Sequence, residues 1–167
     1  MKKEMFLWMS VLLLMIAGLS SCCSDDESDL NSKDVVYESN PKTINGTWYM
    51  VSANYGFGGT EKHQAGEISV TFNEATKTMS IEDKKNINFL KSGNYPYEIT
   101  TEKRRIYTYQ WVDVENQVIV IHYSDEVYGN RDVRYVYSFY DGMLVLDGGM
   151  ASDGPGYYFK KIKDLSN

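Results

Sequence analysis

From residue 46 onward, apolar and polar residues alternate with a period of two, and this pattern limits the possible fold more than any other feature. Ile68, Val70 and Phe72 are each separated by one polar residue. The same alternation recurs in the segments 78–82, 95–99, 107–111, 133–139, 144–146 and 157–162. A period of two over short runs is typical of half-buried β-strands, and we find no helical period after residue 30. We therefore expect an all-β domain.

The number of alternating segments indicates the architecture. About eight or nine antiparallel strands between residues 46 and 163 form either a sandwich or an up-and-down barrel. We favour the barrel, because closing the sheet leaves no exposed edge. This matters here because the only two cysteines, Cys22 and Cys23, are adjacent and make a poor disulfide, so the sheet must hold without one. The pair Asp141-Gly142 is the strongest hairpin-turn signal. A second turn is predicted at Thr100–Lys103.

The N-terminus has the three zones of an export signal. Lys2 and Lys3 give a basic start, and residues 6–19 form an uncharged apolar run. A membrane-spanning helix needs about 20 such residues, so this shorter run fits a signal-peptide core. Leu19-Ser20-Ser21 before Cys22 resembles a bacterial lipobox, which implies cleavage before Cys22 and acylation of that cysteine. The alternative is an ordinary secretory signal cleaved nearby, with both cysteines kept as thiols.

The segment after Cys22 is acidic and poor in apolar residues. Asp25, Asp26, Glu27 and Asp29 resemble the tag that sends some Gram-negative lipoproteins to the outer face of the outer membrane. The periplasmic face, with the acids serving as a solvated spacer, is the alternative. The expected organisation is a signal peptide (1–21), a lipidated, disordered tether (22–42), a barrel domain (43–163) and a short C-terminal tail (164–167).

Two motifs resemble those of lipocalin-like (calycin) barrels. Gly46-Thr47-Trp48 is similar to the G-x-W signature that opens the first strand, and the ending of the chain (144–162) is similar to a final lipocalin-like hairpin. The resemblance implies that Gly46 turns the chain, that Trp48 closes one barrel end, and that a basic residue packs across the tryptophan. Lys160 and Lys161 are the candidates for that residue. The second lipocalin motif has no good counterpart.

The candidate binding residues follow from this barrel. The connection 54–66 is long and glycine-rich, and the resemblance places it over the open mouth as a lid with Phe57 at its tip. The alternative is a surface loop with Phe57 packed back onto the barrel. Tyr97, Tyr109 and Tyr137 are predicted to line the interior. A lipid-anchored module that binds a small apolar or amphipathic ligand is one candidate function. A filled barrel that docks a protein partner or inhibits an enzyme is the other.

Other functional classes are less well supported by the sequence. The net charge is −6 and the barrel segment is only mildly acidic, which argues against nucleic-acid binding. His63 and His122 lack the spacing of a metal site, and the loop Asp147–Gly154 is predicted to be a hairpin loop rather than a Ca²⁺ site. We find no catalytic constellation, and we expect neither an enzyme nor a cofactor.

Overall fold

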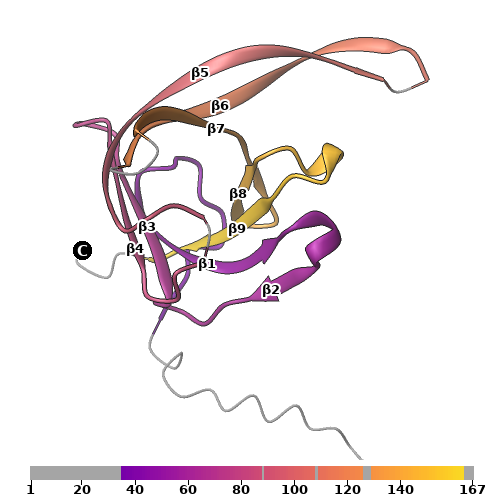
Figure 1. Cartoon of the computed structure of the whole chain (residues 1–167). Helices are drawn as coiled ribbons and strands as arrows, with labels where there is room; N and C mark the ends of the chain where they lie inside the picture. Colours follow the sequence, from indigo (N-terminus) through magenta and orange to yellow (C-terminus); the bar gives the residue numbers. More distant parts are fainter. Residues whose placement is uncertain (1–34, 88, 108, 126–128, 164–167) are drawn as a thin grey trace, which may run out of the picture. The chain divides into compact units, whose positions relative to one another are not determined.

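The computed structural model describes residues 35–87, 89–107, 109–125 and 129–163 (Figure 1). This part of the chain is all-β, with two short 3-10 turns, η1 (Gly56–Gly58) and η2 (Met150–Ser152). The strands are β1 (Gly46–Asn54), β2 (Thr60–Lys62), β3 (Ile68–Asn73), β4 (Thr78–Asp83), β5 (Gly93–Tyr107), β6 (Trp111–Asp125), β7 (Gly129–Tyr140), β8 (Met143–Asp147) and β9 (Gly156–Lys161). The predicted all-β, antiparallel fold is confirmed.

Pairing of the first and last long strands closes the sheet into a barrel. The order β1-β3-β4-β5-β6-β7-β8-β9 returns to β1, because β1 also pairs with β9 from Trp48↔Lys161 to Asn54↔Gly156. The short strand β2 lies outside this ring of eight and pairs with the end of β1. A closed eight-stranded antiparallel barrel is consistent with the lipocalin-like fold that the sequence resembles.

Large side chains occupy the inward positions of the barrel. The alternating residues of β3 are buried, as predicted, and so are Ile119 and Ile121 of β6. The largest fully buried side chains include aromatic ones from three strands: Trp48, Phe72 and Phe159. Barrels of this size can be filled by their own side chains, and the described interior side chains form one contiguous cluster.

Trp48 is buried near the start of β1. Its side chain is 0% exposed, and its indole Nε1 donates a 2.7 Å hydrogen bond to the carbonyl oxygen of Ile44. The basic residue over the ring is Lys161, whose Nζ lies 5.8 Å from the ring centroid and 3.1 Å from a carboxylate oxygen of Glu38. A Cβ at Gly46, where φ is +107°, would approach this lysine to 3.2 Å.

Lys160 does not have the predicted barrel-end role. Its position is one residue away from Lys161 on β9, so its side chain points to the other face of the sheet. It is exposed and lies over the ring of Tyr37 at 5.6 Å.

The folded part of the chain begins before residue 43, where the sequence placed the domain start. Tyr37 forms a β-bridge with Ile162, and the backbone N–H of Glu38 donates to the carbonyl oxygen of Lys161. Pro41 and Ile44 are both buried. Residues 37–44 therefore cover the Trp48 end of the barrel rather than continuing the tether.

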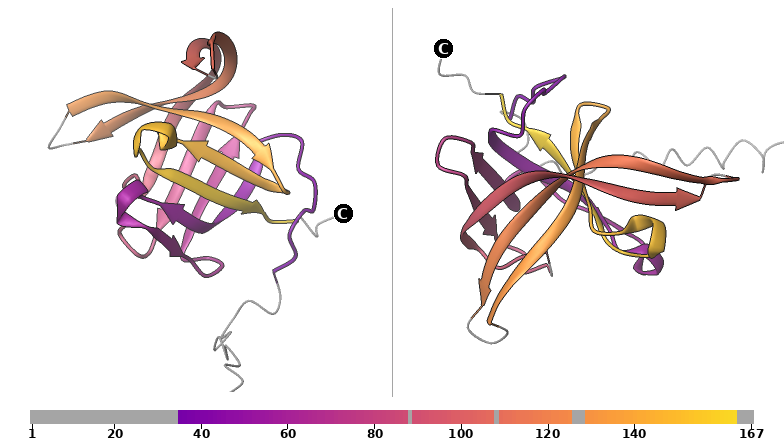
Figure 2. Two further views of the ribbon diagram at one scale, coloured as in Figure 1. Left: turned by 90° about the vertical axis from the view of Figure 1, so that its right-hand side faces the viewer. Right: turned by 90° about the horizontal axis from the view of Figure 1, so that it is seen from above.

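The hairpin β5–β6 extends past the barrel as a two-stranded arm (Figures 1 and 2). β4 pairs with residues 93–96 of β5, and β7 pairs with residues 118–125 of β6. Beyond these pairings, residues 102–107 pair with residues 111–116. We call these two segments, with Tyr109 and Gln110 between them, the arm. The turn predicted at Thr100–Lys103 is wrong, because these residues lie within the uninterrupted strand β5.

The turn predicted at Asp141-Gly142 is confirmed. Both residues have positive φ, +50° and +71°, and they join Tyr140 of β7 to its partner Met143 of β8. Such a pair of left-handed residues is the two-residue turn whose twist matches that of the flanking strands.

The buried Trp48 and the exposed Phe57 provide a matched test of the fold. Trp48→Ala should lower the free energy of unfolding by about 3–5 kcal/mol, because it removes a buried indole and leaves a cavity. Phe57→Ala should change it by less than about 0.5 kcal/mol, because this side chain is 93% exposed. Urea denaturation of both variants measures the difference. Equal losses would show that Phe57 packs in the core and that this arrangement is wrong.

Candidate functional site

The four residues predicted to bind a ligand do not come together. Phe57 lies in η1 and is directed away from the barrel, with 93% of its side chain exposed. Tyr109 lies in the connection between β5 and β6, has a φ of +66°, and is 99% exposed. The prediction that it lines the interior is therefore wrong. Tyr97 of β5 and Tyr137 of β7 both pack in or against the core, on the two strands that flank β6.

Tyr97 acts as a core residue. Its ring packs edge-on against Phe72 with 5.5 Å between centroids, and the residue is 2% exposed. Burial raises the pKa of its hydroxyl, with smaller contributions from Glu74 and Tyr137. That hydroxyl has no hydrogen-bond partner among the described residues. Tyr97 is therefore packed within the core, and Tyr137 is partly buried against the same core.

The connection between β4 and β5 fills the mouth of the barrel, a role that the sequence assigned to the 54–66 loop. Residues 84–87 and 89–92, which we call the plug, insert Phe89 and Leu90 into the core. The Phe89 ring lies 4.5 Å from that of Tyr157, 5.8 Å from Tyr135 and 5.9 Å from Phe159. Burial in this aromatic cluster raises the pKa of Tyr157 to about 12.

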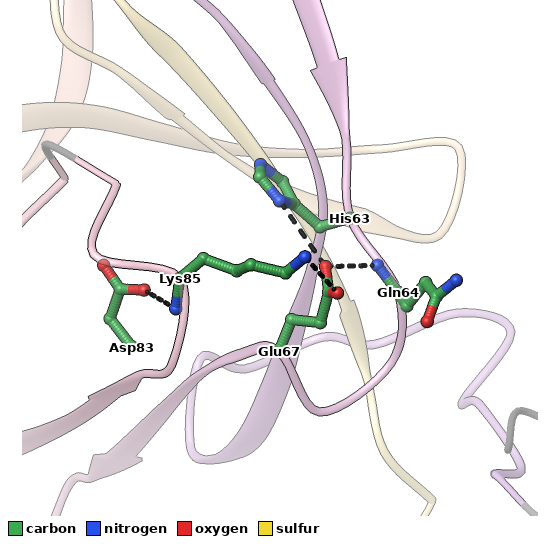
Figure 3. Close-up of polar contacts among 5 residues, drawn as sticks. All are labelled: His63, Gln64, Glu67, Asp83 and Lys85. Carbon is green, nitrogen blue, oxygen red and sulfur yellow. Dashed lines mark hydrogen bonds and ion pairs between the residues drawn. The ribbon is translucent and has the colours of Figure 1, made fainter.

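Glu67 ties the plug to the segment between β2 and β3 (Figure 3). One carboxylate oxygen lies 2.8 Å from Nζ of Lys85, and the other accepts a 3.0 Å hydrogen bond from the backbone N–H of Gln64. The backbone carbonyl of Glu67 also accepts from the N–H of Lys84. The hydrogen bond with Lys85 lowers the pKa of Glu67.

His63 packs beside this carboxylate. Its side chain is buried, and its Nδ1 lies 3.9 Å from an oxygen of Glu67 (Figure 3). Its Nε2 has no hydrogen-bond partner among the described residues.

Two other polar groups singled out from the sequence have structural partners. Asp147 accepts 2.6 Å hydrogen bonds from the backbone N–H groups of Gly149 and Met150, so its carboxylate stabilises the loop. His122 pairs with Asp132 at 2.9 Å in an exposed groove between β6 and β7. Within the described part of the chain, no three His, Cys, Asp or Glu side chains cluster as they would around a metal ion.

The arm is the surface that the sequence did not predict. Trp111 is 62% exposed, and Tyr109 and Val112 beside it are also exposed. Two ion pairs join the strands of the arm between these residues and the barrel. Lys103 lies 3.6 Å from Glu115, and Arg105 lies 3.8 Å from Asp113. The Arg105 guanidinium is also 6.0 Å from the centroid of the Trp111 ring. At the base of the arm, Arg134 of β7 pairs with Glu102.

Comparisons with protein families, curated proteins and solved structures give no match for this chain. In the described residues, no helix has the length and apolar character needed to cross a bilayer. The candidate sites therefore depend on the structure alone.

The Glu67 contact predicts a specific acid sensitivity. Because the folded-state pKa of Glu67 is lowered, its contribution to stability is present above the ordinary value of 4.5 and is lost as the pH falls through the folded-state pKa. Glu67→Gln should therefore be less stable than the wild type at pH 7, and the difference should shrink at pH 3. Urea denaturation at both values measures this.

Glu82→Gln is the matched control, because Glu82 lies on the neighbouring strand in an exposed, 4.0 Å pair with Lys84. A difference between wild type and Glu67→Gln that is unchanged at pH 3 would show that the carboxylate is not the anchor of the plug.

Proposed function

We propose that this chain is a membrane-anchored, non-catalytic interaction module. In this proposal the barrel is a rigid scaffold whose interior is filled by side chains, and the arm is the surface that binds a partner outside the barrel. The anchor is an acyl group on Cys22, and the acidic residues after it direct the protein to the outer face of the outer membrane. The proposal assigns no metal or cofactor to the protein.

The exposed aromatic arm is the observation that carries the proposal. Aromatic residues dominate the energetics of many interfaces, because a large ring buries much area with few rotatable bonds. Trp111 and Tyr109 are held at the end of a paired ribbon that extends past the barrel (Figure 2). An isolated two-stranded ribbon gains little from packing against itself. Its extension beyond the barrel is better explained by contact with a partner than by stability.

The interior gives less support to binding of a small ligand. Phe89 fills the mouth, and the predicted ligand residues lie in two separate exposed segments or pack in or against the core. A ligand entering from this end would have to displace the plug and its contacts with Glu67. An eight-stranded barrel remains compatible with ligand binding, so this is the alternative function.

Photo-crosslinking in intact cells tests the proposal. A photoreactive phenylalanine analogue placed at Tyr109 should give a discrete adduct with an external partner, whether protein or lipid. The same analogue at Phe57, an equally exposed aromatic position in η1, should give only diffuse background. Adding Trp111→Ala to the Tyr109-labelled chain should reduce the adduct, because it removes the neighbouring ring.

Similar labelling from both positions would contradict the assignment of the arm as the binding surface. Mass spectrometry of the mature N-terminus from the same preparation checks the anchor, and an unmodified Cys22 would contradict that part of the proposal.

A further inference from the structure

We propose that the end of the arm binds the lipid–water interface of the membrane that carries the protein's own anchor. This inference rests on the proposed function, since it names the partner of the arm and assumes the acyl group on Cys22. The binding residues are Tyr109, Trp111 and Val112.

The chemistry of these side chains matches the interfacial region of a bilayer. Tryptophan and tyrosine concentrate at membrane–water interfaces, because each combines an apolar ring with a polar group that stays hydrated. Trp111 and Tyr109 are both exposed, and Val112, which follows Trp111 and points to the other face of the ribbon, adds apolar area on that face. Residues 107–112 carry no charged side chain, and the Arg105 guanidinium beside the Trp111 ring is paired with Asp113, which lowers the cost of moving the end of the arm out of water.

The charges behind the tip favour a neutral surface over a charged partner. Residues 102–116 contain three basic side chains, Lys103, Arg104 and Arg105, and three acidic ones, Glu102, Asp113 and Glu115. Most of these are paired within the protein, across the arm or with Arg134. An arm built to bind an acidic protein or an anionic lipid would carry an excess of positive charge. Insertion of uncharged rings into the interfacial layer needs no such excess.

The shape of the arm also fits a planar, deformable surface. Tyr109 lies where the two strands are joined, at the end of the ribbon farthest from the β6–β7 pairing (Figures 1 and 2). A projecting ribbon end can enter an interfacial layer without a complementary pocket. Interfacial segments typically bury their apolar side chains by about 5–10 Å, which is within the reach of one or two residues of a strand.

The length of the tether keeps the arm close to a membrane. If Cys22 is acylated, residues 22–34 join the anchor to the first described residue, Val35. At about 3.3–3.6 Å per extended residue, these thirteen residues span at most about 45 Å. A weak affinity of the tip for lipid would therefore act at a high effective concentration.

The two tryptophans left after signal removal allow a direct test. The full sequence has three tryptophans, and Trp8 lies in the predicted signal peptide. Of the other two, Trp48 is fully buried and Trp111 is exposed. The mature, acylated chain should be reconstituted in phosphatidylcholine vesicles with and without bromine on the acyl chains. We expect loss of most Trp111 emission in the brominated vesicles, while the Trp48 emission that remains in Trp111→Phe is unchanged.

Two further variants distinguish binding of the arm to lipid from mere closeness of the whole anchored domain to the vesicle surface. Tyr109→Asn should reduce the quenching of Trp111, and asparagine suits the positive φ at this position, so the connection should keep its conformation. Phe57→Ser should leave the quenching unchanged, because Phe57 lies outside the arm.

The outcomes also separate this inference from the proposed function. Trp111 emission that is equal in the two kinds of vesicle would overturn lipid binding. If position 109 still formed a discrete adduct with a protein in cells, the arm would remain an interaction surface with a protein partner. If neither experiment gave a signal, both proposals would be wrong.

Discussion

The pairing of β1 with β9 is the interaction on which the rest of the structure depends. It joins two strands that are distant in sequence, and it uses both edges of what would otherwise be an open sheet. The pair Trp48↔Lys161 lies at one end of this seam, where the indole is buried under Ile44 and the lysine reaches Glu38. The chain that precedes the barrel therefore helps to hold the seam together. Loss of Trp48 would weaken the closure as well as the core.

Closure also limits which surfaces of the domain are available for binding. Because the barrel strands satisfy one another's backbone groups, the wall offers few sites for an added strand. The interior is occupied by side chains from the wall and by Phe89 from the plug. The β5–β6 hairpin extends beyond the closed barrel, because residues 102–107 and 111–116 lie past the segments that pair with β4 and β7. This difference in strand length creates the arm, and it places two exposed aromatic residues, Tyr109 and Trp111, away from the core.

The parts of the structure that could be predicted from the sequence are those set by local chemistry. Alternation identified the strands because each barrel strand has one buried face, and Asp141-Gly142 identified a turn because few other residue pairs adopt its backbone conformation. The G-x-W motif predicted a strand that opens at Gly46, and β1 begins there with Trp48 buried. Lys160 was chosen as readily as Lys161 because the two differ by one position, and only the register of β9 against β1 decides which one faces the ring.

The errors have a common physical cause. The arm has no core to face, so the polar residues of Thr100–Lys103 carry no strand signal and were interpreted as a turn. Tyr109 continued the alternation of Tyr107 and Trp111, although the chain reverses there. Phe89 was missed because it is a single inserted residue without a period. Residues that act through tertiary placement, rather than through a repeating pattern, leave little trace in one sequence.

The central claim is that the barrel is a scaffold with a packed interior and that binding takes place on its outer surface. Methyl-labelled protein titrated with a medium-chain fatty acid tests this directly by NMR, because Ile119 and Ile121 report on the interior and Val112 reports on the arm. We predict no saturable shift of the Ile119 and Ile121 methyl signals at concentrations that perturb Val112. Saturable, one-to-one shifts of the interior methyl groups would contradict the claim and would establish the barrel as a ligand-binding cavity.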